Sequence, residues 1–409
     1  MTSEAWIIDA ARTPRGIGKQ GKGALSHLHP QHLGATVLNA LRDRNGIDTS
    51  EVDDVVWGCS SQSGKQGACI GRMSVLDAGW DTRASAVTID RFCGSGISSV
   101  GFAAASVMAG MEDLVVAGGV EMMSYTATLP PNTLDAGNLH LRDLHPQPHQ
   151  GVCADVIATL EGIGRKEVDA LAHESQRRAA HAIEQGHFDK SLVPVANEDG
   201  SVALEADEFP RPETTLSGLA ELQTVFDRFM GFPIDDTGET FDGLVRRVYP
   251  DLEINHIHHA GNSSGVVDGA AGLLVASPEY ARGQGWRPRA RVVAMANVAG
   301  SPELMLNEPV PAAKKVLAKA GMTMNDIDLI EVNEAFAVVA YKFMRDLDVD
   351  PAKCNVNGGA IALGHPIAAT GSILIGTLLD ELERRDLTFG LATMCAAGGM
   401  APAIIIERL

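Results

Sequence analysis

The sequence predicts an α/β fold made of two homologous halves. Short apolar runs alternate along the 409 residues with longer stretches of helical period, as in layered α/β proteins. The order of these runs also recurs, because "EVDDVVWGC" at residues 51–59 corresponds to "NDIDLIEVN" at residues 325–333. An internal repeat of this kind indicates two halves with one common architecture.

In the first half, short apolar runs predict strands and two longer stretches predict helices. The strands are expected at residues 5–9, 52–58, 87–90 and 113–119. Residues 32–44 carry apolar positions at helical spacing, and residues 97–109 are almost wholly small and apolar. The second of these stretches therefore predicts a buried helix.

The second half repeats this order. Helices are expected at residues 309–320 and 367–384, and strands at 327–332, 354–357, 391–396 and 401–407. The helix that follows His365 thus corresponds to the helix that follows Cys93.

The composition of the region between the halves, residues 121–250, shifts toward Pro, His, Asp and Arg. Residues 129–151 have no sustained period and predict an ordered loop, whereas residues 165–186 predict a helix. We interpret this region as a lid over the active site, since binding residues concentrate on such loops. The predicted division is 1–120 plus about 251–280 for the N-terminal half, 121–250 for the lid and 281–409 for the C-terminal half.

The charge balance limits the class of partner. The chain has 33 Lys and Arg against 52 Asp and Glu, a formal net charge of −19, which argues against binding nucleic acid or an anionic membrane surface. No apolar stretch is long enough to span a bilayer. No signal segment precedes the first strand, so we expect a cytoplasmic protein. The six cysteines include no CxxC pair, which disfavours a zinc site.

Cys93 stands in "DRFCGSGISS", directly before the predicted buried helix. A helix start with exposed glycine N–H groups can stabilise a thiolate, which makes a cysteine nucleophilic. The alternative is a buried structural cysteine, because free cysteines are commonly buried.

Further polar groups end the apolar runs of the second half. His365 lies between Gly364 and Pro366 at a predicted helix start, and histidine is the usual base that activates a thiol. Asn333 and Glu334 end one strand and Cys395 ends another. A lone histidine is more often a packed core residue, but these groups all stand at the ends of β runs.

With these motifs, "CGSG" at Cys93, "NEAF" at Asn333, "GHP" at His365 and "CAAGG" at Cys395, the chain resembles the thiolase family. Supporting matches over the rest of the chain are "RTP" (12–14), "AGGVEMMS" (117–124), "DEFPR" (207–211) and "AGNSSGVVDG" (260–269). The resemblance implies two βαβαββ halves packed as a five-layer sandwich, an inserted loop domain, and a homodimer or dimer of dimers. It implies coenzyme A (CoA) and acyl-CoA as substrates, with no covalently bound cofactor and no metal.

The resemblance also implies a ping-pong reaction. Cys93, deprotonated by His365, attacks the 3-keto carbon of a 3-oxoacyl-CoA and keeps the acyl group. Cys395 protonates the departing acetyl-CoA enolate and later deprotonates the incoming CoA. His365 and a water held by Asn333 would stabilise the enolate oxygen, and the backbone N–H groups of Cys93 and Ala397 would stabilise the tetrahedral intermediate.

Binding residues follow from the same motifs. The resemblance implies Arg211 for the adenine and phosphate end of CoA, and Ser264, Ala335, Phe336 and His149 for the pantetheine arm and pocket. Many relatives have glycine where this chain has Ala397, so the oxyanion assignment requires a negative φ there.

The chain departs from compact acetoacetyl-CoA-type relatives in two places. Residues 124–151 are shorter, which puts a tetramer-forming loop in doubt, and residues 227–259 are longer, which favours a bulkier acyl group. The second stretch includes His256, His258 and His259, which resemble a metal cluster, but a strand would place the last two on opposite faces. "RGIGKQGKG" at residues 15–23 lacks the ending of a phosphate loop and predicts a glycine-rich turn.

Other functions explain less of the sequence. A cysteine hydrolase built from Cys93, Asn333 and His365 leaves Cys395 without a role. Related decarboxylating condensing enzymes generally use two histidines where this chain has His365 and Cys395. A non-catalytic acyl-CoA-binding relative has no need of all four groups. The sequence therefore favours a degradative 3-ketoacyl-CoA thiolase, with an acetoacetyl-CoA-forming acetyltransferase as the alternative.

Overall fold

A computed structural model describes residues 4–130 and 133–409. In these residues the strands form a ten-stranded sheet and a separate two-stranded hairpin. The N-terminal half of the large sheet contains, in spatial order, β4 (Val87–Ile89), β3 (Asp54–Gly58), β5 (Leu114–Met122), β8 (Val267–Ala276) and β1 (Trp6–Arg12). The C-terminal half contains β10 (Leu329–Val332), β11 (Phe389–Thr393), β12 (Met400–Arg408) and β9 (Ala290–Ala299).

The two halves have the same strand order and directions. β8 pairs antiparallel with β1 and β5, and β12 pairs antiparallel with β9 and β11. β3 pairs parallel with β5, as β10 does with β11. The predicted α/β fold with two similar halves is therefore confirmed. The two halves form one continuous sheet, because Trp6 and Ile7 of β1 pair with Arg291 and Ala290 of β9. Each half counts as a sheet of its own in the layered architecture.

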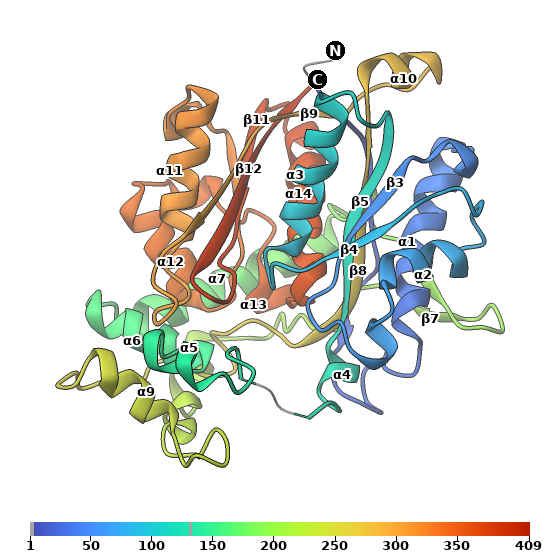
Figure 1. The fold of residues 1–409 in the computed structure, drawn as a ribbon. Coiled ribbons are helices and arrows are strands. Elements are labelled where there is room, and N and C mark those ends of the chain that lie inside the picture. The colour runs from blue at the N-terminus through green and yellow to red at the C-terminus, as the bar shows by residue number, and fades with distance from the viewer. Residues whose placement is uncertain (1–3, 131–132) are drawn as a thin grey trace.

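Helices form three layers: one lies between the N-terminal and C-terminal halves of the sheet, and one covers each outer face (Figure 1). The central layer is α3 (Ser95–Met108) against α14 (Thr370–Arg384), and it buries apolar side chains from both sheets. The outer layers are α1 (Pro30–Asn45) with α2 (Ile70–Asp77), and α11 (Pro309–Ala320) with α12 (Ala337–Asp346). Two sheets and three helical layers make the five layers that the family resemblance implies.

The region between the halves lies along one edge of the sandwich, at the bottom of Figure 1. Its helices are α4 (Met123–Thr126), α5 (Leu139–Leu144), α6 (Gln150–Leu160), α7 (Arg165–Glu184), α8 (Leu216–Glu221) and α9 (Phe241–Val248). Its remaining elements are the hairpin of β6 (Val195–Ala196) and β7 (Val202–Leu204) and the 3-10 turn η3 (Phe226–Phe229). Short elements elsewhere are β2 (Gly16–Ile17), α10 (Pro278–Gly283), α13 (Ala360–Leu363) and η6 (Ile367–Ala369). Among the described residues, no helix has the length and apolar character needed to cross a membrane.

Two predicted elements were wrong. The expected loop at residues 129–151 contains α5, whose first turn is capped by Asn138 Oδ1 accepting from Leu141 N at 3.2 Å. The expected strand at 354–357 is reduced to one bridge between Cys354 and Ile330. A 3-10 turn ends at Lys353 and Asn355 has φ +48°, so the chain cannot stay extended there.

Candidate active site

A cavity of about 560 Å³ lies where both halves meet the inserted region. Cys93 and His365 line it, as does Ala397. The inserted region contributes His149 and several phenylalanines. A cavity of this size, with few polar groups, is typical of a small-molecule site.

The close crossing of α3 and α14 brings the Cys93 and His365 segments together. An added Cβ at Gly96 would lie 2.6 Å from Ser372 N, and one at Gly371 would lie 2.2 Å from Ile97 N. Only glycine fits at these two positions, so the starts of both helices meet. Cys93 precedes α3 by two residues, and His365 directly precedes the segment that enters α14.

Cys93 is half-buried, after Phe92 with φ +50°. Burial raises the pKa of its thiol far above the ordinary value, and the nearby Cys395 and Glu121 raise this pKa further. The sequence predicted a thiolate stabilised by the helix start, but desolvation outweighs that effect here. A raised pKa favours the neutral thiol of Cys93 at pH 7.

His365 lines the same cavity as Cys93. Burial, and to a smaller extent the charge of Arg15, lowers the pKa of His365 to about 3. Its Nδ1 lies 2.6 Å from Thr370 Oγ1, and its Nε2 lies 3.5 Å from Asn333 Nδ2. With the Asn333 amide in this orientation, the compatible neutral tautomer has its proton on Nδ1 and leaves Nε2 able to accept a proton.

Asn333 and Glu334 follow β10 and are buried. The Glu334 carboxylate accepts from Ser175 Oγ at 2.6 Å, from Asn355 Nδ2 at 3.0 Å and from the Ile361 backbone N at 3.2 Å. These bonds fix the strand end that holds Asn333. Within the described part of the chain, the buried Asn333 Oδ1 has no hydrogen-bond partner, so it is free to accept from a bound water.

Cys395 follows β11 and is only 1% exposed. Burial raises the pKa of its thiol to about 12. A charge on Cys395 would raise the pKa of Cys93, so the two sulfurs are electrostatic neighbours. Ala397 is not among the residues with positive φ, which meets the requirement for its backbone N–H.

Four of the five predicted CoA-side residues line the cavity: His149, Ser264, Ala335 and Phe336. The Ser264 backbone N donates to Ala335 O at 3.0 Å, which joins these two segments of the wall. Arg211 is not part of the lining; it is exposed, with its guanidinium 5.9 Å from the Phe209 ring centroid.

Sequence reasoning missed a buried ion pair behind His365. Arg12 binds Asp207 through two hydrogen bonds of 2.8 and 2.9 Å, and Arg15 donates its backbone N to Asp207 at 2.8 Å. The Arg15 guanidinium donates to Gly364 O at 3.0 Å, next to His365. The "RTP" and "DEFPR" motifs thus meet, although nothing in their sequence spacing predicts the contact.

Sequence reasoning also missed Glu121, which is fully buried. Its carboxylate accepts from Ser60 N, Ser61 N and Gln66 Nε2 at 3.0, 3.1 and 2.8 Å. Its charge acts on Cys93. The sequence signal that could have found Glu121 is its position as a charged residue in the otherwise apolar strand β5.

The inserted region closes the cavity with an aromatic wall. The His149 ring stacks on Phe226 and Phe229, with centroids 5.7 and 5.2 Å apart, and meets the edge of Phe241 at 5.8 Å. Phe229 and Phe241 come from the longer segment, residues 227–259, that the sequence connects with a bulkier acyl group, and Phe226 directly precedes it.

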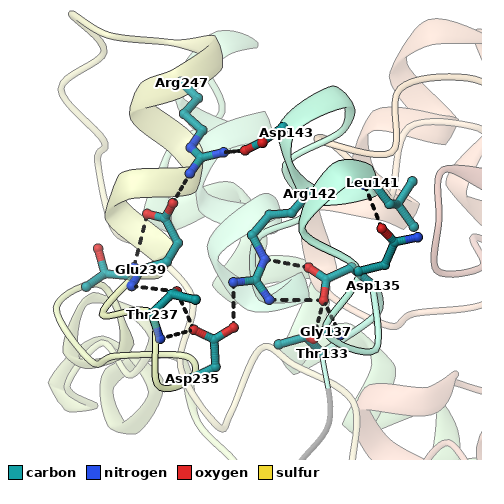
Figure 2. A network of polar contacts seen from close by, with 12 residues as sticks. Thr133, Asp135, Gly137, Leu141, Arg142, Asp143, Asp235, Thr237, Glu239 and Arg247 are labelled. Atoms are coloured by element: carbon teal, nitrogen blue, oxygen red, sulfur yellow. Dashed lines mark hydrogen bonds and ion pairs between the residues drawn. The ribbon is translucent and has the colours of Figure 1, made fainter.

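A salt-bridge network holds the segments of this wall together (Figure 2). Buried Arg142 binds Asp135 with bonds of 2.7 and 3.0 Å, and Asp235 with one of 2.5 Å. Arg247 binds Asp143 at 2.8 Å and also contacts Glu239. The network therefore links residues 135–143 to residues 235–247.

The histidines at 256–259 bind carboxylates. His256 and His258 contact the two oxygens of Asp155, both at 2.7 Å, and His259 Nε2 lies 2.8 Å from Asp169. The segment is irregular instead of a strand. These contacts give the histidines a structural role between the inserted region and β8.

Thr370 is a positioning residue for His365. We expect Thr370→Val, which keeps the shape but removes the hydroxyl, to lower kcat about 10- to 100-fold with little change in KM. Without this acceptor the buried Nδ1–H is unpaired, which costs about 1–3 kcal/mol and favours the wrong tautomer. Steady-state kinetics of Thr370→Val and Thr370→Ser test this; recovery by serine is expected, and an equal loss in both variants would contradict it.

Comparison with known proteins agrees with this geometry. A family model described as "Thiolase, N-terminal domain" matches residues 5–232, and one described as "Thiolase, C-terminal domain" matches residues 286–408. A steroid 3-ketoacyl-CoA thiolase of Mycobacterium tuberculosis is 38% identical, over 100% of this chain and 95% of its own. A 3-oxoadipyl-CoA/3-oxo-5,6-dehydrosuberyl-CoA thiolase of Escherichia coli is 39% identical, over 99% of this chain and all of its own. The crystal structure of a Bacillus anthracis acetyl-CoA acetyltransferase has a TM-score of 0.85 and 32% identity, and the match covers 100% of this chain and 99% of that one.

Proposed function

The chain belongs to the thiolase family and is an acyltransferase, and we propose that it cleaves 3-oxoacyl-CoA with CoA to give acetyl-CoA and a shortened acyl-CoA. The observation that carries this proposal is the arrangement of three groups: the Cys93 thiol and the neutral His365 line one cavity, and the buried thiol of Cys395 lies close enough to Cys93 for its charge to raise the pKa of Cys93. A cysteine hydrolase would need only the first two.

In the first half-reaction, the Cys93 proton moves to His365 Nε2 as the sulfur attacks the 3-keto carbon. The bond between C2 and C3 then breaks, and its electron pair remains on acetyl-CoA as an enolate. The Cys395 thiol protonates that enolate, which leaves a Cys395 thiolate and an acyl thioester on Cys93. This division of roles needs one nucleophile and one separate acid.

In the second half-reaction, the Cys395 thiolate removes the proton of the incoming CoA thiol. The CoA sulfur attacks the acyl thioester, and the Cys93 sulfur leaves and recovers its proton from His365. Both thiols and the imidazole return to their neutral resting forms, which are the forms that their shifted pKa values favour.

Two oxyanions need hydrogen-bond donors. We assign the backbone N–H groups of Cys93 and Ala397 to the tetrahedral intermediate, supported by the absence of a left-handed φ at Ala397. We assign a water held by Asn333, together with His365, to the enolate oxygen. The unpartnered, buried Asn333 Oδ1 supports this second assignment.

Substrate binding is proposed for the wall residues Ser264, Ala335, Phe336 and His149, with the charged end of CoA outside the cavity. Arg211 is exposed and free to meet a phosphate there. A homodimer is proposed as well, since edge strand β4 and α3 expose Val87 (41%) and Phe102 (45%). The cytoplasmic location and the domain boundaries stay predictions.

The reverse condensation, which forms acetoacetyl-CoA, is the second candidate, because the same groups catalyse both directions. The similarity to the Bacillus anthracis acetyl-CoA acetyltransferase supports it. The aromatic wall supports the degradative direction, since a two-carbon acyl group needs little of that apolar space.

Peptide mass spectrometry after acid quench tests the mechanism. After brief incubation with acetoacetyl-CoA or 3-oxohexanoyl-CoA and no free CoA, we expect the acyl mass on the Cys93 peptide. Later addition of CoA should remove it. An acyl group on Cys395 instead, or none with either substrate, would overturn the assignment.

A further inference from the structure

No charged side chain is among the described residues that line the cavity. Its described lining side chains are apolar, aromatic, hydroxyl, amide, thiol or imidazole groups, with no Lys, Arg, Asp or Glu among them. Both imidazoles are uncharged at neutral pH, since burial lowers the pKa of His149 and of His365.

Two carboxylates act electrostatically on Cys93. Buried Glu121 and the carboxylate of Asp90 both raise the pKa of Cys93, so their fields reach the reacting sulfur. The cation nearest to His365 is Arg15, but its guanidinium is bound to Gly364 O and lies 3.7 Å from Asp207. Arg91 stands two residues before Cys93 in sequence but is not part of the cavity lining, so no described cation faces the cavity at this end.

Two cations of the inserted region, Arg142 and Arg247, are also occupied, whereas Arg211 and Arg228 are exposed and lie outside the cavity lining. Arg142 and Arg247 share four carboxylates, those of Asp135, Asp143, Asp235 and Glu239 (Figure 2). Thr133 and Leu134, which line the cavity, directly precede Asp135. The network behind this wall therefore carries more negative than positive charge.

From these observations we infer that the cavity selects uncharged, apolar acyl groups and rejects a 3-oxoacyl-CoA that ends in a carboxylate. A buried carboxylate without a partner is strongly unfavourable, and no charged side chain of the described lining could pair with it. Selectivity of this kind arises because the rejected substrate binds unfavourably, and it needs no extra contacts to the accepted substrate. The inference rests on the proposed function and names its substrate class.

The family alone does not give this result. One relative of 39% identity is named for 3-oxoadipyl-CoA, whose acyl group ends in a carboxylate, and another of 38% for a steroid substrate. In this chain, the stack of His149 with Phe226 and Phe229 offers an apolar surface to the acyl group.

A matched substrate pair tests the inference. 3-Oxohexanoyl-CoA and 3-oxoadipyl-CoA have the same six-carbon acyl chain and differ in the terminal methyl or carboxylate. We expect kcat/KM for thiolysis to be at least about 100-fold higher for 3-oxohexanoyl-CoA. Values within tenfold of each other, or a preference for 3-oxoadipyl-CoA, would overturn the selectivity while the proposed function stands. No turnover of either substrate would overturn the proposed function itself.

Leu134 provides a gain-of-function variant. It lines the cavity and is 40% exposed, so an added cation there stays partly hydrated. Leu134→Arg is expected to raise relative use of 3-oxoadipyl-CoA at least about tenfold, while the neutral Leu134→Gln leaves the ratio near that of the wild type. An unchanged ratio in Leu134→Arg, or an equal shift in both variants, would overturn the electrostatic origin of the selectivity.

Discussion

Cys93→Ala is expected to lose thiolase activity by about 10⁴-fold or more and to take up no acyl label, because no other thiol is among the described residues that line the cavity. Cys395→Ala is expected to lose about 10²- to 10⁴-fold, the usual contribution of a general acid–base group. That variant should still collect the acyl group on Cys93 during long incubation, since its nucleophile and His365 are intact. The two variants therefore separate the nucleophile from the acid–base group.

The measurement combines steady-state thiolysis with mass spectrometry of both cysteine peptides. Cys69→Ser is the matched control, since Cys69 is the exposed thiol and lies outside the cavity lining; its activity should stay within about twofold of wild type. Far-ultraviolet circular dichroism verifies that each variant is folded. A labelled Cys395 peptide in Cys93→Ala would contradict the division of roles, as would full activity in Cys395→Ala.

The local pattern of apolar residues was sufficient to predict most helices and strands of the fold. The buried helix predicted at 97–109 is α3 (Ser95–Met108), and the helix predicted at 309–320 is α11 (Pro309–Ala320), because their apolar spacing is regular over several turns. Residues 354–357 have the composition of a strand, but Asn355 has φ +48° and its side chain binds the backbone of Val332. That long-range contact decides the local conformation and leaves no trace in the local pattern.

The candidate site likewise has residues that the sequence indicates and contacts that only the fold reveals. Cys93, His365, Asn333 and Cys395 stand in motifs, so the sequence indicates them directly. Arg15 reaches Gly364 across 349 positions of sequence, and only the folded chain brings them together. The raised pKa of Cys93 also could not be predicted from the sequence. It depends on burial beside Cys395 and Glu121 and not on the helix that follows.

Asp207→Asn is expected to destabilise the fold by about 3–5 kcal/mol, the usual effect of removing one partner from a buried ion pair. The side chains of Arg12 and Asp207 are each 2% exposed, and Arg15 shares the same carboxylate. The variant leaves two buried guanidinium groups without a counter-charge. A large shift of the midpoint of chemical unfolding at pH 7 should follow, whereas Asp199→Asn on the exposed turn between β6 and β7 should shift it little.

The dependence on pH distinguishes this ion pair from a packing effect. Burial alone would raise the pKa of Asp207, but Arg12 and Arg15 hold it below the ordinary value. A lowered pKa means that the stabilisation is complete above the unfolded-state pKa of about 3.9 and is lost as the pH falls through the lower folded-state pKa. The difference in unfolding midpoint between wild type and Asp207→Asn should therefore be constant from pH 7 to about pH 5 and shrink in stronger acid. A difference that stays the same in strong acid would mean that the carboxylate acts through shape, with its charge irrelevant to the stability of the segments that support His365.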